Sequence, residues 1–244
     1  MMDKEAHDAW HVREHGPIEK LADNLWRVQG SLPGMSLRRT MTVVRRRSGE
    51  LVIHSAIALE NAAMHELESW GTPCFLLIPN RGHTLDAAAY RKRYPAIKVF
   101  TPRGGVKQVE GKIHGVIDGD YEAFPSDDEV RLSTLHGVAD GEGVMLVRSS
   151  DGLTVVLNDC VMNMDKKRDL LGYLFTTLMG SAPGPRISRF AKLMFIKDQA
   201  ALRRDLLGFA ALPDVKRLIV AHEKLAEGPE ARRALERAAS FLHA

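Results

Sequence analysis

Apolar runs and short polar interruptions alternate along the first part of the chain. The segments 25–30, 40–47 and 51–55 are short, rich in branched or aromatic residues, and separated by Gly, Pro or Ser. Such runs are typical of sequential strands, and Ser48-Gly49 between the second and third is typical of a hairpin turn. The pattern therefore predicts three neighbouring strands in this region.

The rest of the chain is predicted to carry further strands and helices in two groups. Apolar residues spaced four apart predict a helix over residues 58–69, and a glycine follows at position 71. We expect further strands over 74–78, 97–101, 129–135, 143–148, 153–157 and 215–222. We expect further helices over 85–94, 168–179, 187–196 and 198–211, and a terminal helix that starts after Gly228-Pro229.

This order of elements points to an α+β fold. Each half of the chain has several strands and then helices, without strict βαβ alternation, so two mixed sheets with helices on their outer faces fit better than a Rossmann fold. The sequence contains neither G-x-G-x-x-G nor G-x-x-x-x-G-K-[ST], which removes most support for nucleotide-binding classes. No linker rich in Pro, Ser or Gly divides the chain. We therefore expect a polar N-terminal arm over 1–17, and one domain over 18–244 with a helical insertion at about 168–211.

Composition narrows the range of partners. A net charge of +3 in 244 residues gives no reason to expect nucleic acid. Cys74 and Cys160 are too few for a disulfide framework, so we expect reduced thiols and a cytoplasmic protein. The most apolar stretch, 170–179, is too short to span a bilayer, so no membrane partner is expected. Its helix would pack on the domain, cover the site as a lid, or form a homodimer face within 170–196.

Three apolar strands each end in a side chain that can bind a metal. "LLIPNRGH" ends at His83, "TVVLND" at Asp159 and "RLIVAH" at His222. Strand ends can hold converging side chains rigidly, and His and Asp suit zinc, iron or manganese. A carboxylate that follows an apolar run costs free energy to bury unless it is paired or bound to metal. The alternative is that the three residues bond to one another or to the backbone without an ion.

A second histidine motif, near the N-terminus, is not interpreted as a metal site. "HVREH", from His11 to His15, matches the H-x-x-E-H pattern of inverted zinc proteases. It precedes the first strand, and Gly16-Pro17 would end any helix at once. We therefore interpret it as part of the polar arm.

The ordered set of motifs resembles the metallo-β-lactamase superfamily over roughly residues 18–242. "IPNRGHTLDAAAYRKRYPAIKVF" is similar to the segment of that family that begins with H-x-H-x-D-H, and His83 falls on its final histidine. "LHGVADGEGVMLV" stands where the family has a loop like G-H-T-P-G. Asp159 stands at the bridging aspartate, and His222 at the last histidine. The resemblance implies an αββα sandwich of two mixed sheets, with the active site at one edge of both sheets.

The departures from the family pattern imply a reduced metal site. Ile78, Asn80 and Gly82 stand where the family has its first two histidines and its aspartate. A third ligand for that metal position would fall on Asp140, or on His136. The resemblance then leaves one ion at most, held by His83, Asp159 and His222. The helical insertion, "IPNRGH" and "HS" also resemble an uncharacterised branch of the superfamily.

Two functions are consistent with this residue set. The sequence favours slightly a protein with weak or no catalytic activity that binds a small molecule or a partner in the same cleft. The alternative is a mononuclear metal-dependent hydrolase of an ester, thioester, amide or phosphoester. In the hydrolase, Asp140 or His136 would shuttle protons, and Asn80 or His54 would donate a hydrogen bond to the oxyanion. An unrelated mixed α/β binding domain is a third possibility.

Overall fold

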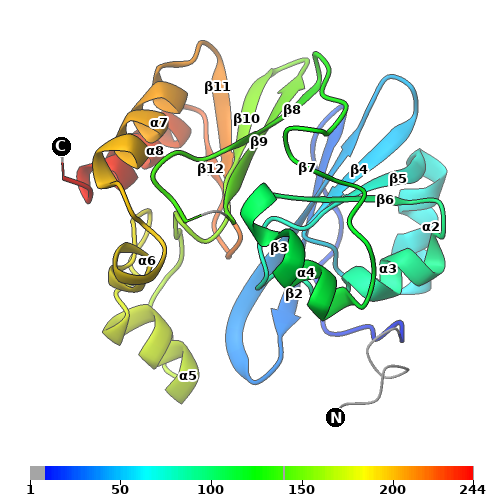
Figure 1. Ribbon diagram of the computed structural model, residues 1–244, viewed down its shortest axis with the longest axis horizontal. Helices are drawn as coiled ribbons and strands as arrows, with labels where there is room; N and C mark the ends of the chain where they lie inside the picture. Colours follow the sequence, from blue (N-terminus) through cyan, green and yellow to red (C-terminus); the bar gives the residue numbers. More distant parts are fainter. Residues whose placement is uncertain (1–8, 140, 244) are drawn as a thin grey trace.

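Two β-sheets pack face to face, and helices cover the outer face of each (Figure 1). The computed structural model describes residues 9–139 and 141–243. Within these residues the first sheet has the strand order β1-β2-β3-β4-β5-β6-β7 and the second has β12-β11-β10-β9-β8. The α+β sandwich of two mixed sheets predicted from the sequence is confirmed.

The strands of the first sheet are β1 (Glu19–Ala22), β2 (Leu25–Leu32), β3 (Met35–Arg45), β4 (Glu50–His54), β5 (Thr72–Leu77), β6 (Lys98–Thr101) and β7 (Gly119–Asp120). Those of the second are β8 (Val130–Thr134), β9 (Gly143–Ser149), β10 (Gly152–Val156), β11 (Val215–Ile219) and β12 (Ala226–Glu227). The α-helices are α2 (Asn61–Trp70), α3 (Ala87–Arg93), α4 (Val106–Ile113), α5 (Leu170–Tyr173), α6 (Arg189–Met194), α7 (Gln199–Ala211) and α8 (Pro229–Ser240).

Both sheets mix strand directions. In the first sheet β1 to β4 are antiparallel, and β4 to β7 are parallel. In the second, β10 and β11 are parallel, and the other neighbours are antiparallel. Because β10 and β11 run the same way, the residues that follow them leave the sheet at the same edge. This edge places the candidate site.

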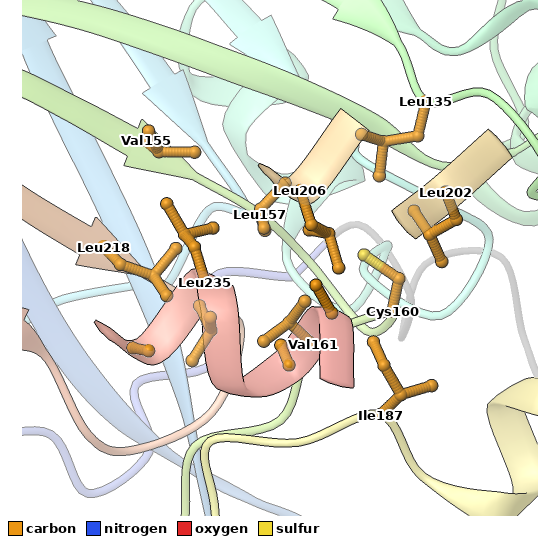
Figure 2. Packing of buried hydrophobic residues seen from close by; sticks show 14 of the residues in the cluster. Leu135, Val155, Leu157, Cys160, Val161, Ile187, Leu202, Leu206, Leu218 and Leu235 are labelled. Atoms are coloured by element: carbon orange, nitrogen blue, oxygen red, sulfur yellow. The ribbon is translucent and has the colours of Figure 1, made fainter. Parts of the chain in front are cut away.

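Three layers of apolar side chains hold the sandwich together. The layer between the sheets joins Val52 and Leu77 of the first sheet to Val147 and Val156 of the second. A second layer packs α2, α3 and α4 on the outer face of the first sheet. The third packs α7 and α8 on the second sheet. Figure 2 shows members of this third layer gathered into one cluster, among them Val155 of β10, Leu202 of α7 and Leu235 of α8.

The helical insertion departs from the expected single helix. Instead of one α-helix over 168–179, α5 makes one turn and a π-helical turn (Leu174–Leu178) follows. The Thr176 hydroxyl donates to the Gly172 carbonyl at 2.6 Å, which competes with the regular backbone ladder. No helix in the described part of the chain is long and apolar enough to cross a membrane.

Sequence patterns missed α4 and the short strands β1, β7 and β12. Polar residues dominate α4, with two valines and one isoleucine, so its helical period is weak. The strands β7 and β12 have two residues each, too short for a period-2 pattern. Elements this short form because a neighbouring strand offers hydrogen-bond partners.

The segment that carries the H-x-x-E-H motif is extended and packs on the first sheet. His15 forms a β-bridge with Gly30, and its Nε2 accepts a hydrogen bond from the Glu60 backbone N–H at 3.0 Å. The Trp10 indole N–H donates to the Leu59 carbonyl at 3.0 Å. From Trp10 onward the expected polar arm is therefore attached to the sheet, and residues 1–8 lie outside the described residues.

A buried ion pair joins the centre of β3 to the start of α3. The guanidinium of Arg39 contacts the carboxylate of Asp86, and the two side chains are 6% and 4% exposed. The same carboxylate accepts from the Ala58 N–H at 2.9 Å, and Arg39 donates to the Ala56 carbonyl at 3.0 Å. These bonds fix the loop that leads from β4 to α2.

We expect Asp86→Ala to lower the free energy of unfolding by about 3–5 kcal/mol, because Arg39 would stay buried without a counter-ion. Urea denaturation of the two proteins measures the difference. Asp128→Ala is the matched control, since Asp128 pairs with Arg131 at the surface and should cost less than about 1 kcal/mol. Equal costs for the two variants would contradict the structural role assigned to the buried pair.

Candidate metal centre

Three side chains from both sheets meet where the sheets come together. His83 follows β5 of the first sheet, whereas Asp159 and His222 follow the parallel strands β10 and β11 of the second. The Nε2 atoms of His83 and His222 lie 3.2 and 3.3 Å from the same oxygen, Oδ1 of Asp159. All three candidate ligand atoms lie within 4.8 Å of one another.

The far side of each imidazole ring is fixed by a hydrogen bond. Nδ1 of His222 lies 2.9 Å from the Arg38 carbonyl, which only accepts, so this nitrogen carries the proton. Nδ1 of His83 lies 2.7 Å from the hydroxyl of Ser55. Such partners on the outer nitrogen are typical of metal-binding histidines, because they direct the Nε2 lone pair toward the ion.

Two of the three distances between the ligand atoms match those expected around one ion. Ligand atoms about 2.0–2.2 Å from a tetrahedral zinc ion lie roughly 3.3–3.5 Å apart. The two distances from Asp159 Oδ1 are close to this value. Three protein ligands leave a fourth position for water or substrate. The His/Asp/His group can therefore hold a metal ion.

Contacts within the cluster shift the pKa values of Asp159 and His222 toward their charged forms. Burial raises the pKa of Asp159, but the charge of His83 and the hydrogen bonds of both histidines outweigh it and hold that pKa well below its ordinary value. Burial lowers the pKa of His222, and its hydrogen bond to Asp159 outweighs this, so the net shift is upward. The carboxylate is thus the anionic centre of the site.

The other oxygen of Asp159 belongs to a second set of hydrogen bonds. The side-chain amide of Asn80 donates to Asp159 Oδ2 at 2.8 Å and to Glu142 Oε1 at 3.0 Å. Its own oxygen accepts from the Gly82 N–H at 2.7 Å. Both amide hydrogens are therefore used inside the protein, and Asn80 connects the His83 loop to the carboxylate that His83 contacts.

Glu142 is a site residue that the sequence reasoning missed. It directly precedes β9, is almost fully buried, and its Oε2 atom has no hydrogen-bond partner among the described residues. Burial and the nearby charge of Asp159 raise its pKa well above the ordinary value. An acid next to an apolar run was the signal used for Asp159, and the same signal marks Glu142. Ser55 was missed as well, although it directly follows His54.

The remaining sequence candidates do not belong to the ligand group, or lie outside the described residues. His136 is 79% exposed, and its ring and backbone N–H contact Asp205 of α7. His54 is buried at the end of β4, where burial and then the charge of His83 lower its pKa to about 3. Asp140 lies outside the described residues.

Two cavities meet at Gly82, Asp159 and Phe195. One, of about 260 Å³, exposes all three candidate ligands and is otherwise mainly apolar. Its apolar wall is formed by Leu32, Met35, Leu37, Leu85, Met162, Phe175, Phe190 and Ala191. The other, of about 380 Å³, is more polar and is bordered by Asn80, Arg81, Gln108, Lys112 and Glu142. A substrate could thus place an apolar group and a polar group on opposite sides of Asp159.

Comparison with known proteins decides the fold. No protein-family model matches the chain, and no curated protein sequence matches it. A metallo-β-lactamase from Erythrobacter litoralis, solved with β-mercaptoethanol in the active site, gives a TM-score of 0.60 at 14% identity over 92% of this chain and 96% of that one. The DIM-1 metallo-β-lactamase gives 0.64 at 12% identity over 93% and 99%. A metallo-β-lactamase from Pontibacter korlensis gives 0.60 at 11% identity over 93% and 98%. The chain has the metallo-β-lactamase fold.

The resemblance inferred from the sequence is therefore confirmed for the fold. In this metallo-β-lactamase fold the residues at positions 78, 80 and 82, which the sequence resemblance sets against metal-ligand positions, have local roles. Ile78 is buried, and the Asn80 amide bonds to two carboxylates. At position 82, a Cβ atom would lie 3.0 Å from Asn80 Oδ1 and 3.9 Å from Asp159 Oδ2. A side chain there would crowd the Asn80 bonds.

We expect Ser55→Ala to weaken Zn²⁺ binding about ten- to hundredfold, because the His83 ring loses the partner on its outer nitrogen. Competition with a chromophoric chelator measures the affinity. Ser181→Ala is a matched control, since it removes a buried hydroxyl that has no partner among the described residues. An unchanged affinity in Ser55→Ala would show that this hydroxyl does not orient a ligand.

Proposed function

We propose that this protein is a mononuclear metal-dependent hydrolase of an ester, thioester, amide or phosphoester that carries an apolar group. The observation that supports it best is the convergence of two oriented imidazoles on one oxygen of Asp159. The three side chains line a mainly apolar cavity of about 260 Å³. A metal site with an open position beside an apolar pocket is a common arrangement for hydrolysis.

In this proposal His83, Asp159 and His222 hold one ion. Zinc is the first choice, and two imidazoles with one carboxylate also suit iron or manganese. When bound, the ion supplies Lewis acidity that polarises the scissile carbonyl or phosphoryl group and makes water a stronger nucleophile near neutral pH. The Arg38 carbonyl and Ser55 hold the two rings in place.

The apolar wall binds the substrate and excludes water. Phe175, Phe190 and Phe195 come from the helical insertion and border the same cavity as the candidate ligands. The ring of Phe175 lies 6.2 Å from that of His222, measured between centroids. Acyl or aryl groups fit such a wall better than charged groups do, because a charge placed there would lose its hydration.

The proposed roles of the polar residues near the site differ in part from those expected from the sequence. Asp140 stays a proposed proton shuttle from the sequence alone, since it lies outside the described residues. We propose no such role for His136, whose ring contacts Asp205. Asn80 is proposed as a positioning residue rather than an oxyanion donor, since both of its amide hydrogens are used.

A second candidate function is binding of a small molecule or partner without catalysis. The observation that favours it is the Asn80 amide between Glu142 and Asp159, where the chain's own N–H groups satisfy two carboxylates. We propose that this arrangement limits the site to one ion. The amino-acid differences from the family pattern are also the reason that β-lactams are not proposed as substrates.

The first test is elemental analysis of protein purified without a His-tag. We expect about one equivalent of zinc, iron or manganese per chain, and loss of that metal in His83→Ala and His222→Ala, since two ligands cannot complete the site. His65→Ala is the control, because His65 is exposed on α2. A metal-free protein whose stability does not change with added Zn²⁺ or chelator would contradict the metal site.

The second test distinguishes the proposed hydrolase from a protein that binds a small molecule or partner without catalysis. Hydrolysis of p-nitrophenyl esters with increasing acyl length, the matching thioesters and bis(p-nitrophenyl) phosphate is followed with the metal-loaded protein. We expect turnover that rises with acyl length for the preferred class and that disappears in His222→Ala. Metal binding without turnover of any class would favour the non-catalytic function.

A further inference from the structure

Exposed apolar side chains gather in the helical insertion. Of nine large hydrophobic residues that are exposed in the described chain, seven lie between positions 170 and 194. These are Leu170, Leu171, Tyr173, Leu174, Leu178, Leu193 and Met194. Leu170 is 83% and Leu193 is 80% exposed, which leaves most of each side chain in water. Exposed apolar groups this concentrated mark an interaction surface.

The two helices that carry these side chains are joined in space. The Arg189 N–H at the start of α6 donates to the Met179 carbonyl at 3.0 Å, directly after the π-helical turn. In Figure 1, α5 lies at the lower left and α6 above it, and Asp169 at the start of α5 contacts Ser36 of β3. We call α5, the π-helical turn and α6 the insertion face.

The segment that carries the insertion face is also strongly basic. Residues 166–197 contain seven Lys and Arg and one Asp, a net charge of +6, whereas the whole chain carries +3. The rest of the protein therefore carries −3. Within the described residues, Lys166, Arg168, Arg189 and Lys192 form no ion pair with a carboxylate. The one acid, Asp169, caps α5 through the Gly172 N–H and contacts Ser36.

We propose that the insertion face binds the surface of an anionic phospholipid bilayer. Exposed leucines beside unpaired basic groups are the combination by which interfacial helices attach: the apolar side chains enter the headgroup boundary and the cations meet lipid phosphates. The face lies on the bilayer and does not span it. The proposal departs from the expectation of no membrane partner, which rested on the length needed to cross a bilayer.

The positive charge of the insertion face favours an anionic bilayer over a second copy of the chain as its partner. A symmetric homodimer through 170–196 would bring two strongly basic segments together, and like charges across an interface are unfavourable. A bilayer that contains anionic lipid neutralises the same charge. The attachment also has a consequence for the cavity, because Phe175 and Phe190 of the insertion face form part of its apolar wall.

The test is sedimentation with vesicles and needs neither metal nor enzymatic activity, so its outcome is separate from that of the proposed hydrolase. Vesicles of phosphatidylcholine alone are compared with vesicles that contain about 30% phosphatidylglycerol. We expect the wild-type protein to sediment with the anionic vesicles at least about tenfold more strongly, and high salt to weaken this binding.

Two double variants separate the apolar part from the charged part. We expect Leu170→Glu/Leu193→Glu to reduce binding to anionic vesicles about tenfold or more, and Lys166→Glu/Lys192→Glu to do the same. None of the four side chains is buried, and circular dichroism checks that the fold is kept.

Matched controls change the same kinds of residue elsewhere. Val116→Glu replaces a hydrophobic side chain that is 72% exposed after α4, and Lys98→Glu/Lys107→Glu reverses two exposed charges. Both controls should bind anionic vesicles nearly as the wild type does.

Three results would overturn the proposal. The first is absence of vesicle binding. The second is equal binding to neutral and anionic vesicles. The third is a dimer in sedimentation equilibrium without lipid that Leu170→Glu/Leu193→Glu dissociates, since the face would then serve self-association.

Discussion

The carboxylate of Asp159 is the group on which the candidate site depends. A buried carboxylate is unfavourable unless hydrogen bonds or opposite charges compensate for the lost hydration. Here one oxygen faces two imidazoles, and the other accepts from the Asn80 amide. These groups follow β5, β10 and β11, so the carboxylate is satisfied only when both sheets are assembled. Formation of the site therefore requires the packing of the two sheets against each other.

The groups around this carboxylate are mainly neutral hydrogen-bond partners, which orient the side chains of the site. The Arg38 carbonyl and the Ser55 hydroxyl bond the outer nitrogens of the two histidines. Asn80 joins Asp159 to Glu142 on the side away from the histidines. Hydrogen bonds of this kind keep ligand atoms in place before a ligand arrives, which reduces the free energy needed for ordering.

The helical insertion links the interior of the site to the outer surface. Phe175 and Phe190 of the insertion face border the cavity beside His222, while the leucines of that face are exposed to solvent. One segment therefore shapes the apolar cavity and presents a surface opposite in charge to the rest of the chain. The more polar cavity on the other side of Asp159 is formed by the His83 loop, by α4 and the residues before it, and by the loop before β9, and Met194 and Phe195 of the insertion also border it.

The sequence by itself determined the main strands and helices, because their apolar periods and turn residues are local signals. It also indicated His83, Asp159 and His222 as candidate ligands, since each follows an apolar strand. Only the tertiary structure decided which polar groups surround them. Glu142, Ser55 and the Arg38 carbonyl enter the site through pairing between distant strands, and a backbone carbonyl has no signature in sequence. His136 has the right chemistry, but the loop between β8 and β9 directs it to Asp205. The sequence specifies which side chains are present, whereas the direction in which each side chain points and its distance from the others depend on how the two sheets pack.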